Sequence, residues 1–164
     1  MITFLPVPSF VKSMEFLDQK RLGKQRIEAA QILEVLTNQP ILPSHLQSLV
    51  PFDFSNVVWK NHPAVLMWRD HEEWLKLYLA CAIGEWCFRG YINNLSSPTY
   101  DTSLNSLPSW LGHEPFHLSH RSNLIRKDPT FYRKFWPEED PGLRYFWPTD
   151  FSEFSEKVVN QGEE

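Results

Sequence analysis

The stretch from Leu17 to Leu33, LDQKRLGKQRIEAAQIL, decides the fold, because it combines helically spaced apolar residues with a dense polar face. Leucine and alanine recur on one side of a helical wheel, and the charged residues gather on the neighbouring side. We therefore predict one helix over residues 20–36, ending before Asn38 and Pro40.

The polar face of this helix carries a carboxylate among cations and amides. At about 100° per residue, one arc contains Arg21, Lys24, Gln25, Glu28 and Gln31. Apolar residues share the arc one turn further on, so we expect Glu28 at the boundary between core and cleft. Cations hold phosphates, and a carboxylate beside them can protonate a leaving base or stabilise an oxocarbenium-like centre. The alternative is an ordinary solvated face, on which a Lys24–Glu28 pair contributes roughly 0.2–0.5 kcal/mol.

A second long helix is expected further along the chain. Asn61-His62-Pro63 places a proline at a first helical position, and the largely apolar pattern that follows continues to Phe88, before Gly90. Residues 77–83 are apolar nearly all round, as in a helix surrounded by other helices. This helix is therefore the predicted middle of the core.

The rest of the chain shows shorter helices and loops. Ser9 can cap a helix through residue 17, and two more helices are expected over 116–127 and, restarted by Pro129, through about 135. Residues 39–61 and 94–109 have the composition of loops. No repeat and no alternating strand pattern is present, so the sequence predicts a mainly α protein, a compact single-domain helical bundle with long loops.

Composition and charge limit the classes of function. A chain of 164 residues with 42% hydrophobic residues can build one core, and we expect one domain over residues 1–147 with an acidic tail over 148–164. Residues 1–135 hold 14 basic and 12 acidic side chains and the remainder holds 2 and 8, so the net charge of −4 leaves DNA binding open. No apolar run approaches the roughly 18 residues of a membrane span, and the N-terminus lacks the basic region of a signal peptide. We expect a cytoplasmic monomer with no membrane partner.

The string HEPFH, from His113 to His117, fits the HExxH pattern of zinc proteases. Zinc binding needs both imidazoles on one helical face, but Pro115 disfavours helical geometry at Glu114. We therefore expect the pair to straddle the start of a helix, and we predict no metal site.

A group of polar residues follows this string. His117, His120 and Arg121 lie about one turn apart and precede the basic pair Arg126 and Lys127, which suggests polar groups near a substrate. The alternative is that one or two of these imidazoles cap the core. The seven tryptophans are core candidates first, although one or two could stack on a displaced base.

Four stretches together resemble a bacterial family of uncharacterised proteins labelled pyrimidine-dimer DNA glycosylase-like. They are LDQKRLGKQRIE, NHPAVLMW, EWCFRGY and FHLSHRSNLIRKDPTFYRKFWP, and the resemblance covers about Met1 to Trp147. The family is more distantly similar to the phage endonuclease V type of pyrimidine-dimer glycosylase/AP lyase. In that type a helical domain kinks DNA and flips a base, the N-terminal α-amine attacks the sugar C1′, and a glutamate on the first long helix assists.

The resemblance implies a partner, a reaction and a set of residues. The partner is double-stranded DNA, the reaction is excision of a damaged or modified pyrimidine, and no cofactor is implied. Glu28 corresponds to the catalytic glutamate, and His62, in its His-Pro pair, would face the cleft. The implied DNA contacts are Arg21, Lys24, Arg26, Tyr132, Arg133 and Lys134.

The N-terminus departs from the resembling enzyme type. There a threonine amine is exposed after removal of methionine, whereas here the bulky Ile2 follows Met1 and blocks that removal, and Thr3 stands one position late. If the amine is the nucleophile it is that of Met1, and otherwise water attacks in a monofunctional reaction. Two other classes stay open: a non-catalytic nucleic-acid-binding module of the same fold, and a zinc hydrolase using His113 and His117.

Overall fold

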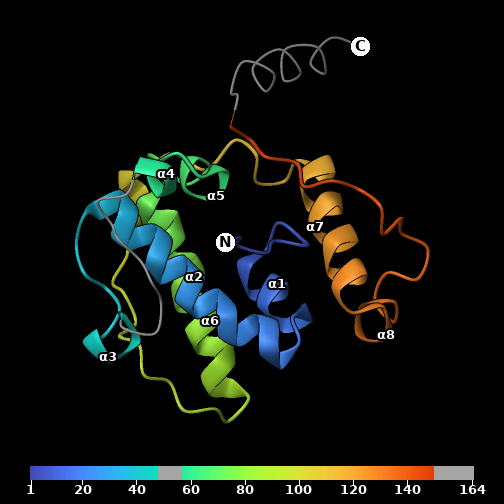
Figure 1. Cartoon of the computed structure of the whole chain (residues 1–164), viewed down its shortest axis with the longest axis horizontal. Coiled ribbons are helices and arrows are strands. Elements are labelled where there is room, and N and C mark those ends of the chain that lie inside the picture. The colour runs from blue at the N-terminus through green and yellow to red at the C-terminus, as the bar shows by residue number, and fades with distance from the viewer. Residues whose placement is uncertain (48–56, 150–164) are drawn as a thin grey trace.

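The computed structural model describes residues 1–47 and 57–149, and this part of the chain is helical with no β-strand (Figure 1). Two long helices, α2 (Gln19–Thr37) and α6 (Glu72–Phe88), pack against each other, and α1 (Phe10–Phe16) packs on α6. Across from this pair lies α7 (Glu114–Lys127), followed at once by α8 (Pro129–Tyr132). The mainly α prediction is confirmed.

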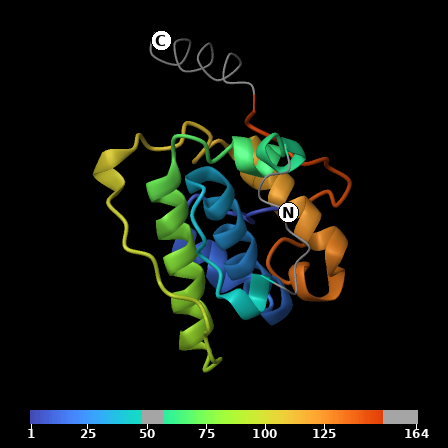
Figure 2. The same cartoon turned by 60° about the vertical axis from the view of Figure 1, so that its left-hand side comes forward.

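The remaining elements are single turns at the edge of the bundle. They are α3 (Ser44–Gln47), α4 (Val57–Lys60), α5 (Pro63–Leu66) and the 3-10 helix η1 (Thr102–Leu104). Figure 2 shows the chain after α6 running back along that helix, and Asn105 fixes it there by accepting hydrogen bonds from the Glu73 N–H at 2.9 Å and the Trp74 indole at 3.2 Å. The predicted acidic tail, 148–164, lies outside the described residues from residue 150 onward. No helix in the described part is both long and apolar enough to cross a membrane.

Local sequence explains where α1 and α2 begin. Ser9 accepts a hydrogen bond from the Lys12 N–H at 3.3 Å, and Asp18 accepts one from the Arg21 N–H at 3.1 Å. Asn38 adopts a left-handed conformation, φ 54°, and ends α2. The predicted Ser9 cap and the predicted bounds of both helices are confirmed to within one or two residues, and the cap at Asp18 is an addition.

The predicted continuous helix from Pro63 to Phe88 is wrong in one respect. The chain interrupts it after α5, and Asp70 takes a left-handed conformation, φ 65°, before α6 starts at Glu72. Aspartate tolerates this conformation better than most residues. Gly90, φ 83°, ends α6 as predicted.

The core is built from buried apolar residues of α1, α2, α6 and α7 and of the loops before α6 and α7. Trp68 and Trp110 are fully buried and meet edge to face with ring centroids 4.9 Å apart, and Tyr78 and Phe116 are buried beside them. Edge-to-face contact is a favoured arrangement of aromatic rings. The prediction that tryptophans build the core is confirmed for these two.

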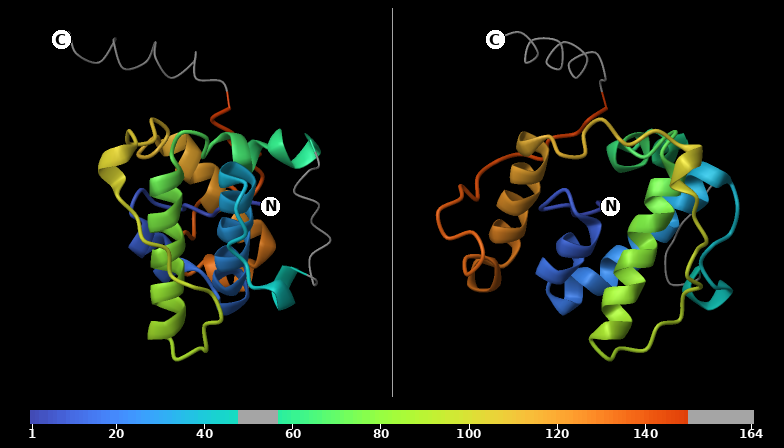
Figure 3. Two further views of the ribbon diagram at one scale, coloured as in Figure 1. Left: turned by 90° about the vertical axis from the view of Figure 1, so that its left-hand side faces the viewer. Right: turned by 180° about the vertical axis from the view of Figure 1, so that it is seen from behind.

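The N-terminal segment, residues 1–6, passes through the middle of the molecule between α2 and α7 (Figure 1; Figure 3, right). The Phe4 N–H donates to the Gln25 side chain on α2, at 2.7 Å, and the Leu5 N–H donates to His120 Nδ1 on α7, at 3.0 Å. The segment therefore joins the two halves of the bundle and brings the first residues of the chain to the site described next.

Candidate functional site

A cleft of about 240 Å³ opens between the N-terminal segment, α2 and the end of α7. Its wall is apolar on the side of the N-terminal segment and polar on the side of α2. It is lined by Ile2, Phe4, Lys20, Arg21, Lys24, Gln25, Glu28 and Lys127. Four of the five residues predicted to share one arc of α2 thus line one cleft, which confirms the predicted polar face.

Glu28 lies at the inner side of this cleft. Its side chain is only 9% exposed, and its Oε2 accepts a hydrogen bond from the Ile2 N–H at 3.2 Å. Lys24, one turn earlier on α2, places its Nζ 3.5 Å from Oε1. The predicted position of Glu28 between core and cleft is confirmed, and the carboxylate is oriented from one side by backbone and from the other by a cation.

Gln25 lies beside Glu28, one turn away on the same helix, and is fully buried. Its Oε1 accepts the Phe4 N–H at 2.7 Å and lies 2.6 Å from the Tyr78 hydroxyl, which also contacts the Phe4 carbonyl. Within the described residues its Nε2 makes no hydrogen bond. The carboxamide is therefore held by one end, and the other end is a buried donor.

Tyr145 adds a second buried polar atom near Glu28. Its ring packs on Phe4 and His120, and its hydroxyl has no hydrogen-bond partner among the described residues. Burial is the main cause that raises the Tyr145 pKa to about 12, and the negative charge of Glu28 raises it further. Tyr145 is therefore a neutral hydroxyl close to the carboxylate.

The α-amine of Met1 lies near His62. Burial is the main cause that lowers the His62 pKa, and the positive charge of the amine lowers it further. His62 Nδ1 accepts the Ala64 N–H at 3.1 Å and caps α5, so the neutral ring carries its proton on Nε2. Trp59 stacks on the imidazole and Trp147 meets it edge to face, which makes this region aromatic.

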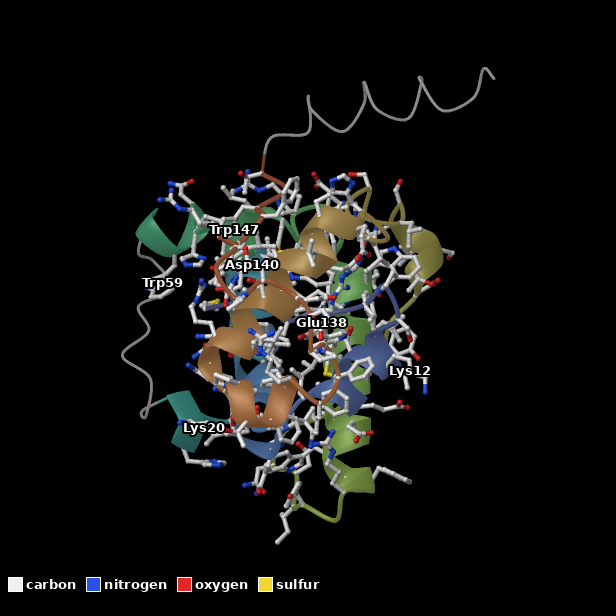
Figure 4. All side chains as sticks on the ribbon, turned by 90° about the vertical axis from the view of Figure 1, so that its right-hand side faces the viewer. Lys12, Lys20, Trp59, Glu138, Asp140 and Trp147 are labelled. Carbon is white, nitrogen blue, oxygen red and sulfur yellow. The ribbon has the colours of Figure 1, made fainter. Side chains whose placement is uncertain are left out.

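The cations around the cleft differ in their partners. Arg21 is held by Asp18 at 2.7 Å, and Lys24 by Glu28. Lys20 and Lys127 make no ion pair within the described residues, and both side chains are exposed. In Figure 4 Lys20 lies at the lower part of the view, and Trp59 and Trp147 lie at the upper part. The cationic residues and the aromatic residues thus lie in different parts of the molecule.

Asp18 holds Arg21 in place with help from α8. Burial opposes ionisation of Asp18, but hydrogen bonds from the Tyr132 hydroxyl and from Arg21 outweigh burial, and the Asp18 pKa is lower than usual. Tyr132 is fully buried, and burial is the main cause that raises its pKa. The structure therefore gives Tyr132 a supporting place behind Arg21 rather than a place on the surface.

Arg26 is a predicted DNA contact, but the structure places it away from the cleft. Its guanidinium lies 4.0 Å from the centre of the Trp86 ring and donates to Asn93 Oδ1 at 2.6 Å, on a side of α2 that does not line the cleft. Burial lowers its pKa. We reassign Arg26 to the packing of α2 on α6.

His117, His120 and Arg121 are also corrected, because all three are buried. His117 Nδ1 donates to the Leu5 carbonyl at 2.8 Å, and Arg121 donates to the Pro6 carbonyl at 2.8 Å. Burial, and then His117, lowers the His120 pKa to about 3, so that this imidazole is neutral. The three side chains hold the N-terminal segment, as in the alternative in which imidazoles cap the core.

The three remaining basic residues lie in or near α7 and α8, outside the cleft. Arg126 and Arg133 donate to backbone carbonyls of the segment 137–143, and Lys134 lies over the Phe131 ring with its Nζ 3.8 Å from the centre. Lys134 is exposed, so it can reach a partner without any rearrangement of the fold. The predicted DNA contacts therefore do not form one site. Among those on α7 and α8, only Lys127 lines the cleft.

The HEPFH string has the geometry expected of it. His113 precedes α7, which starts at Glu114 with Pro115 in its first turn. Both nitrogens of His117 are occupied, since Nδ1 donates to Leu5 and Nε2 accepts the Gly112 N–H at 2.9 Å. His117 therefore has no lone pair for zinc. Among the described residues no group of three or more potential ligands could hold a metal ion.

Sequence reasoning did not include Lys20, Ile2 or Phe4 in the site. A signal for Lys20 exists, because Lys20, Lys24 and Glu28 recur at intervals of four residues along α2. The two apolar residues gave no such signal, since their place depends on the path of the N-terminal segment between α2 and α7.

The fold and the cleft define a class: a helical protein with a cationic cleft around one enclosed carboxylate, close to its own N-terminus. A family model described as pyrimidine dimer DNA glycosylase matches residues 1–99. The chain belongs to the pyrimidine dimer DNA glycosylase family. No curated protein and no solved structure matches it.

Family membership supports a glycosylase-like function on DNA at the level of the family. The matched region contains Glu28, Gln25, His62 and the N-terminal segment. It ends before α7 and α8, so Lys127 and Tyr145 lie outside it.

Proposed function

We propose that this protein cuts the N-glycosidic bond of a damaged or modified pyrimidine in double-stranded DNA. The observation that carries the proposal is the hydrogen bond from the Ile2 N–H to Glu28 Oε2, at 3.2 Å. It holds the first residues of the chain on an enclosed carboxylate, in a cleft surrounded by cations. Family membership supplies the class of substrate.

In the proposed reaction the Met1 amine is the nucleophile and Glu28 is the acid/base group. The neutral amine forms a bond to C1′ of the sugar, and the bond from C1′ to the base nitrogen breaks, its electron pair leaving with the base. The amine then loses a proton, which Glu28 carries to the sugar ring oxygen as the C1′–O4′ bond opens, leaving a protonated imine at C1′. Loss of its remaining N–H proton to the departing base anion gives the imine and the neutral free base. Lys20 and Lys127 would hold the flanking phosphates.

Water is the alternative nucleophile. In that case Glu28 takes a proton from the attacking water, and C1′ gains a hydroxyl as its bond to the base breaks. The base leaves with the electron pair and receives that proton from Glu28, so no covalent intermediate forms. The two routes release the same base and differ in whether the protein is ever bonded to DNA.

The test is incubation with duplex DNA that contains a cyclobutane pyrimidine dimer or another modified pyrimidine, with borohydride present to reduce any imine. A trapped complex whose adduct maps to Met1 supports the amine route, and base release without trapping supports attack by water. If the protein binds DNA in a salt-dependent manner but releases no base from any substrate, the proposal is wrong and the chain is a binding module.

Glu28→Gln provides the residue-level check. The amide keeps an oxygen that can accept the Ile2 N–H but loses the ionisable group, so we expect unchanged DNA affinity and a loss of base release of about 100-fold or more. Single-turnover release and filter binding measure the two effects. Glu15→Gln, on the exposed side of α1, is the matched control and should release base at the wild-type rate.

A further inference from the structure

Gln25 has a polar end that the fold itself does not use. The Phe4 N–H, 2.7 Å from Oε1, fixes which end of the carboxamide is oxygen, because the reversed amide would set an NH2 group against that N–H. Nε2 is thereby left as a donor with no partner among the described residues, in a side chain that is 0% exposed. A buried donor without an acceptor costs about 1–3 kcal/mol. A ligand oxygen in the cleft would remove that cost.

The place of Gln25 in the cleft indicates which part of a nucleotide meets it. The three lysines that line the cleft are exposed, Lys24 with 69% of its side chain, so phosphates can be held at the outer edge of the cleft. Gln25 is instead enclosed with Phe4, in surroundings that favour a flat uncharged group over an anion. The cleft holds the volume of roughly eight water molecules, which is enough for one pyrimidine ring.

We propose that the Gln25 NH2 group donates a hydrogen bond to a ring carbonyl oxygen of the target pyrimidine. The inference rests on the glycosylase function proposed for the same cleft. Every pyrimidine base of DNA has a carbonyl next to its glycosidic nitrogen. When the glycosidic bond breaks, negative charge moves onto that nitrogen and oxygen, and the hydrogen bond becomes stronger. Gln25 therefore positions the base and stabilises it as a leaving group, while Glu28 acts at the sugar.

Two variants separate the donor from the structural role of this side chain. Gln25→Glu keeps an oxygen for the Phe4 N–H and replaces only the donor, whereas Gln25→Met removes both polar atoms without adding charge. Tyr78→Phe is the matched control, because it removes a contact to Oε1 and leaves Nε2 unchanged. Circular dichroism and thermal melting establish that each variant is folded.

The first measurement is single-turnover base release. We expect Gln25→Glu and Gln25→Met to release base about 10- to 100-fold more slowly than the wild type. Tyr78→Phe should release base at a rate within about threefold of the wild-type rate. Release by both Gln25 variants at the wild-type rate would overturn the proposal.

The second measurement compares two duplexes, one with the target pyrimidine and one with a tetrahydrofuran abasic analogue that has no base. Gln25→Met should weaken binding of the first by about 10-fold and leave binding of the second unchanged, which a merely structural role would not do. Equal loss on both duplexes contradicts a contact to the base. If the wild type releases no base at all, the proposed function fails, and the binding comparison alone still decides whether Gln25 contacts the pyrimidine.

Discussion

The cationic residues in and near the cleft fall into two groups. Some already bind another part of the protein, and others are available to bind DNA. Arg21 is held by Asp18, Arg26 lies over Trp86, and Arg121 holds the Pro6 carbonyl. Lys20 and Lys127 have no such partner within the described residues, and both line the cleft. Their charge can therefore be neutralised by phosphate at little cost to the fold.

Lys20→Ala and Lys127→Ala should each weaken DNA binding in a salt-dependent way. If each lysine meets one phosphate, the slope of log K against log salt concentration should become shallower by about 0.9 per variant. Binding titrations at several salt concentrations measure this slope. The control is Lys12→Ala, because Lys12 pairs with Glu15 and lies on the other side of the molecule from Lys20 in Figure 4. A slope that is equal in all three variants would contradict the phosphate contacts.

The part of the site that lies on α2 could be predicted from sequence, because helical periodicity alone places Lys24, Gln25 and Glu28 on one face. Periodicity does not say what a polar face meets. Arg26 is one position from Gln25 but packs on α6, and the polar residues His117 and His120 are buried by a segment more than 100 residues away. For these two residues the sequence is compatible both with a place near a substrate and with a place that caps the core, and the long-range hydrogen bonds select the second.

At the scale of elements, the bounds of α1 and α2 were predictable because caps and stops are local signals. The interruption after α5 was not, since Pro63 and the apolar residues after Asp70 are both compatible with one long helix. The break depends on Trp68 entering the core beside Trp110, a contact between distant parts of the chain. α8 is shorter than predicted for a similar reason, because Phe135 and Trp136 turn to pack against Phe16 on α1.

Two helical glycines give a matched test of how α2 and α6 pack. A Cβ on Gly23 of α2 would lie 3.0 Å from Trp86 Cζ3, and that ring is held by its hydrogen bond to the Ile92 carbonyl and by Arg26. A Cβ on Gly84 of α6 would meet nothing within 4 Å. Gly84→Ala should therefore raise the free energy of unfolding by about 0.5–1 kcal/mol. Gly23→Ala should lower it by about 1 kcal/mol or more, because overpacking outweighs the gain in helix propensity.

Urea denaturation of the two variants measures both changes. The measurement also tests the packing itself, because a gain in stability for Gly23→Ala equal to that for Gly84→Ala would mean that Trp86 moves freely and that the two helices are not in close contact at this point.

At the scale of the whole molecule, the buried imidazoles make stability depend on pH. The pKa of His120 is lowered from 6.5 to about 3, so between these values the unfolded chain binds a proton that the folded chain does not. The free energy of unfolding is therefore highest above about pH 6.5 and decreases as the pH falls through this window. His62 and His117 have lowered pKa values and act in the same direction.

His120→Asn tests this dependence. An asparagine oxygen can take the place of Nδ1 as the acceptor for the Leu5 N–H but does not titrate. We expect the variant to be less stable than the wild type at about pH 7.5, and to lose less stability than the wild type on going to about pH 5. Thermal melting at the two pH values gives both quantities, and parallel losses in the two proteins would show that His120 does not carry the effect.

The passage of residues 1–6 between α2 and α7 also has a consequence for the order of events during synthesis. These residues are made before the helices that enclose them, but Leu5 is held by His117 and His120, which are made 112 and 115 residues later. Contacts so distant in sequence form slowly, and the N-terminal segment cannot make its contacts with α7 until α7 has been synthesised. The cleft residue Lys127 and the α7 contacts of the N-terminal segment are therefore absent until α7 has been made, and a chain that ended before α7 would hold the segment from α2 alone.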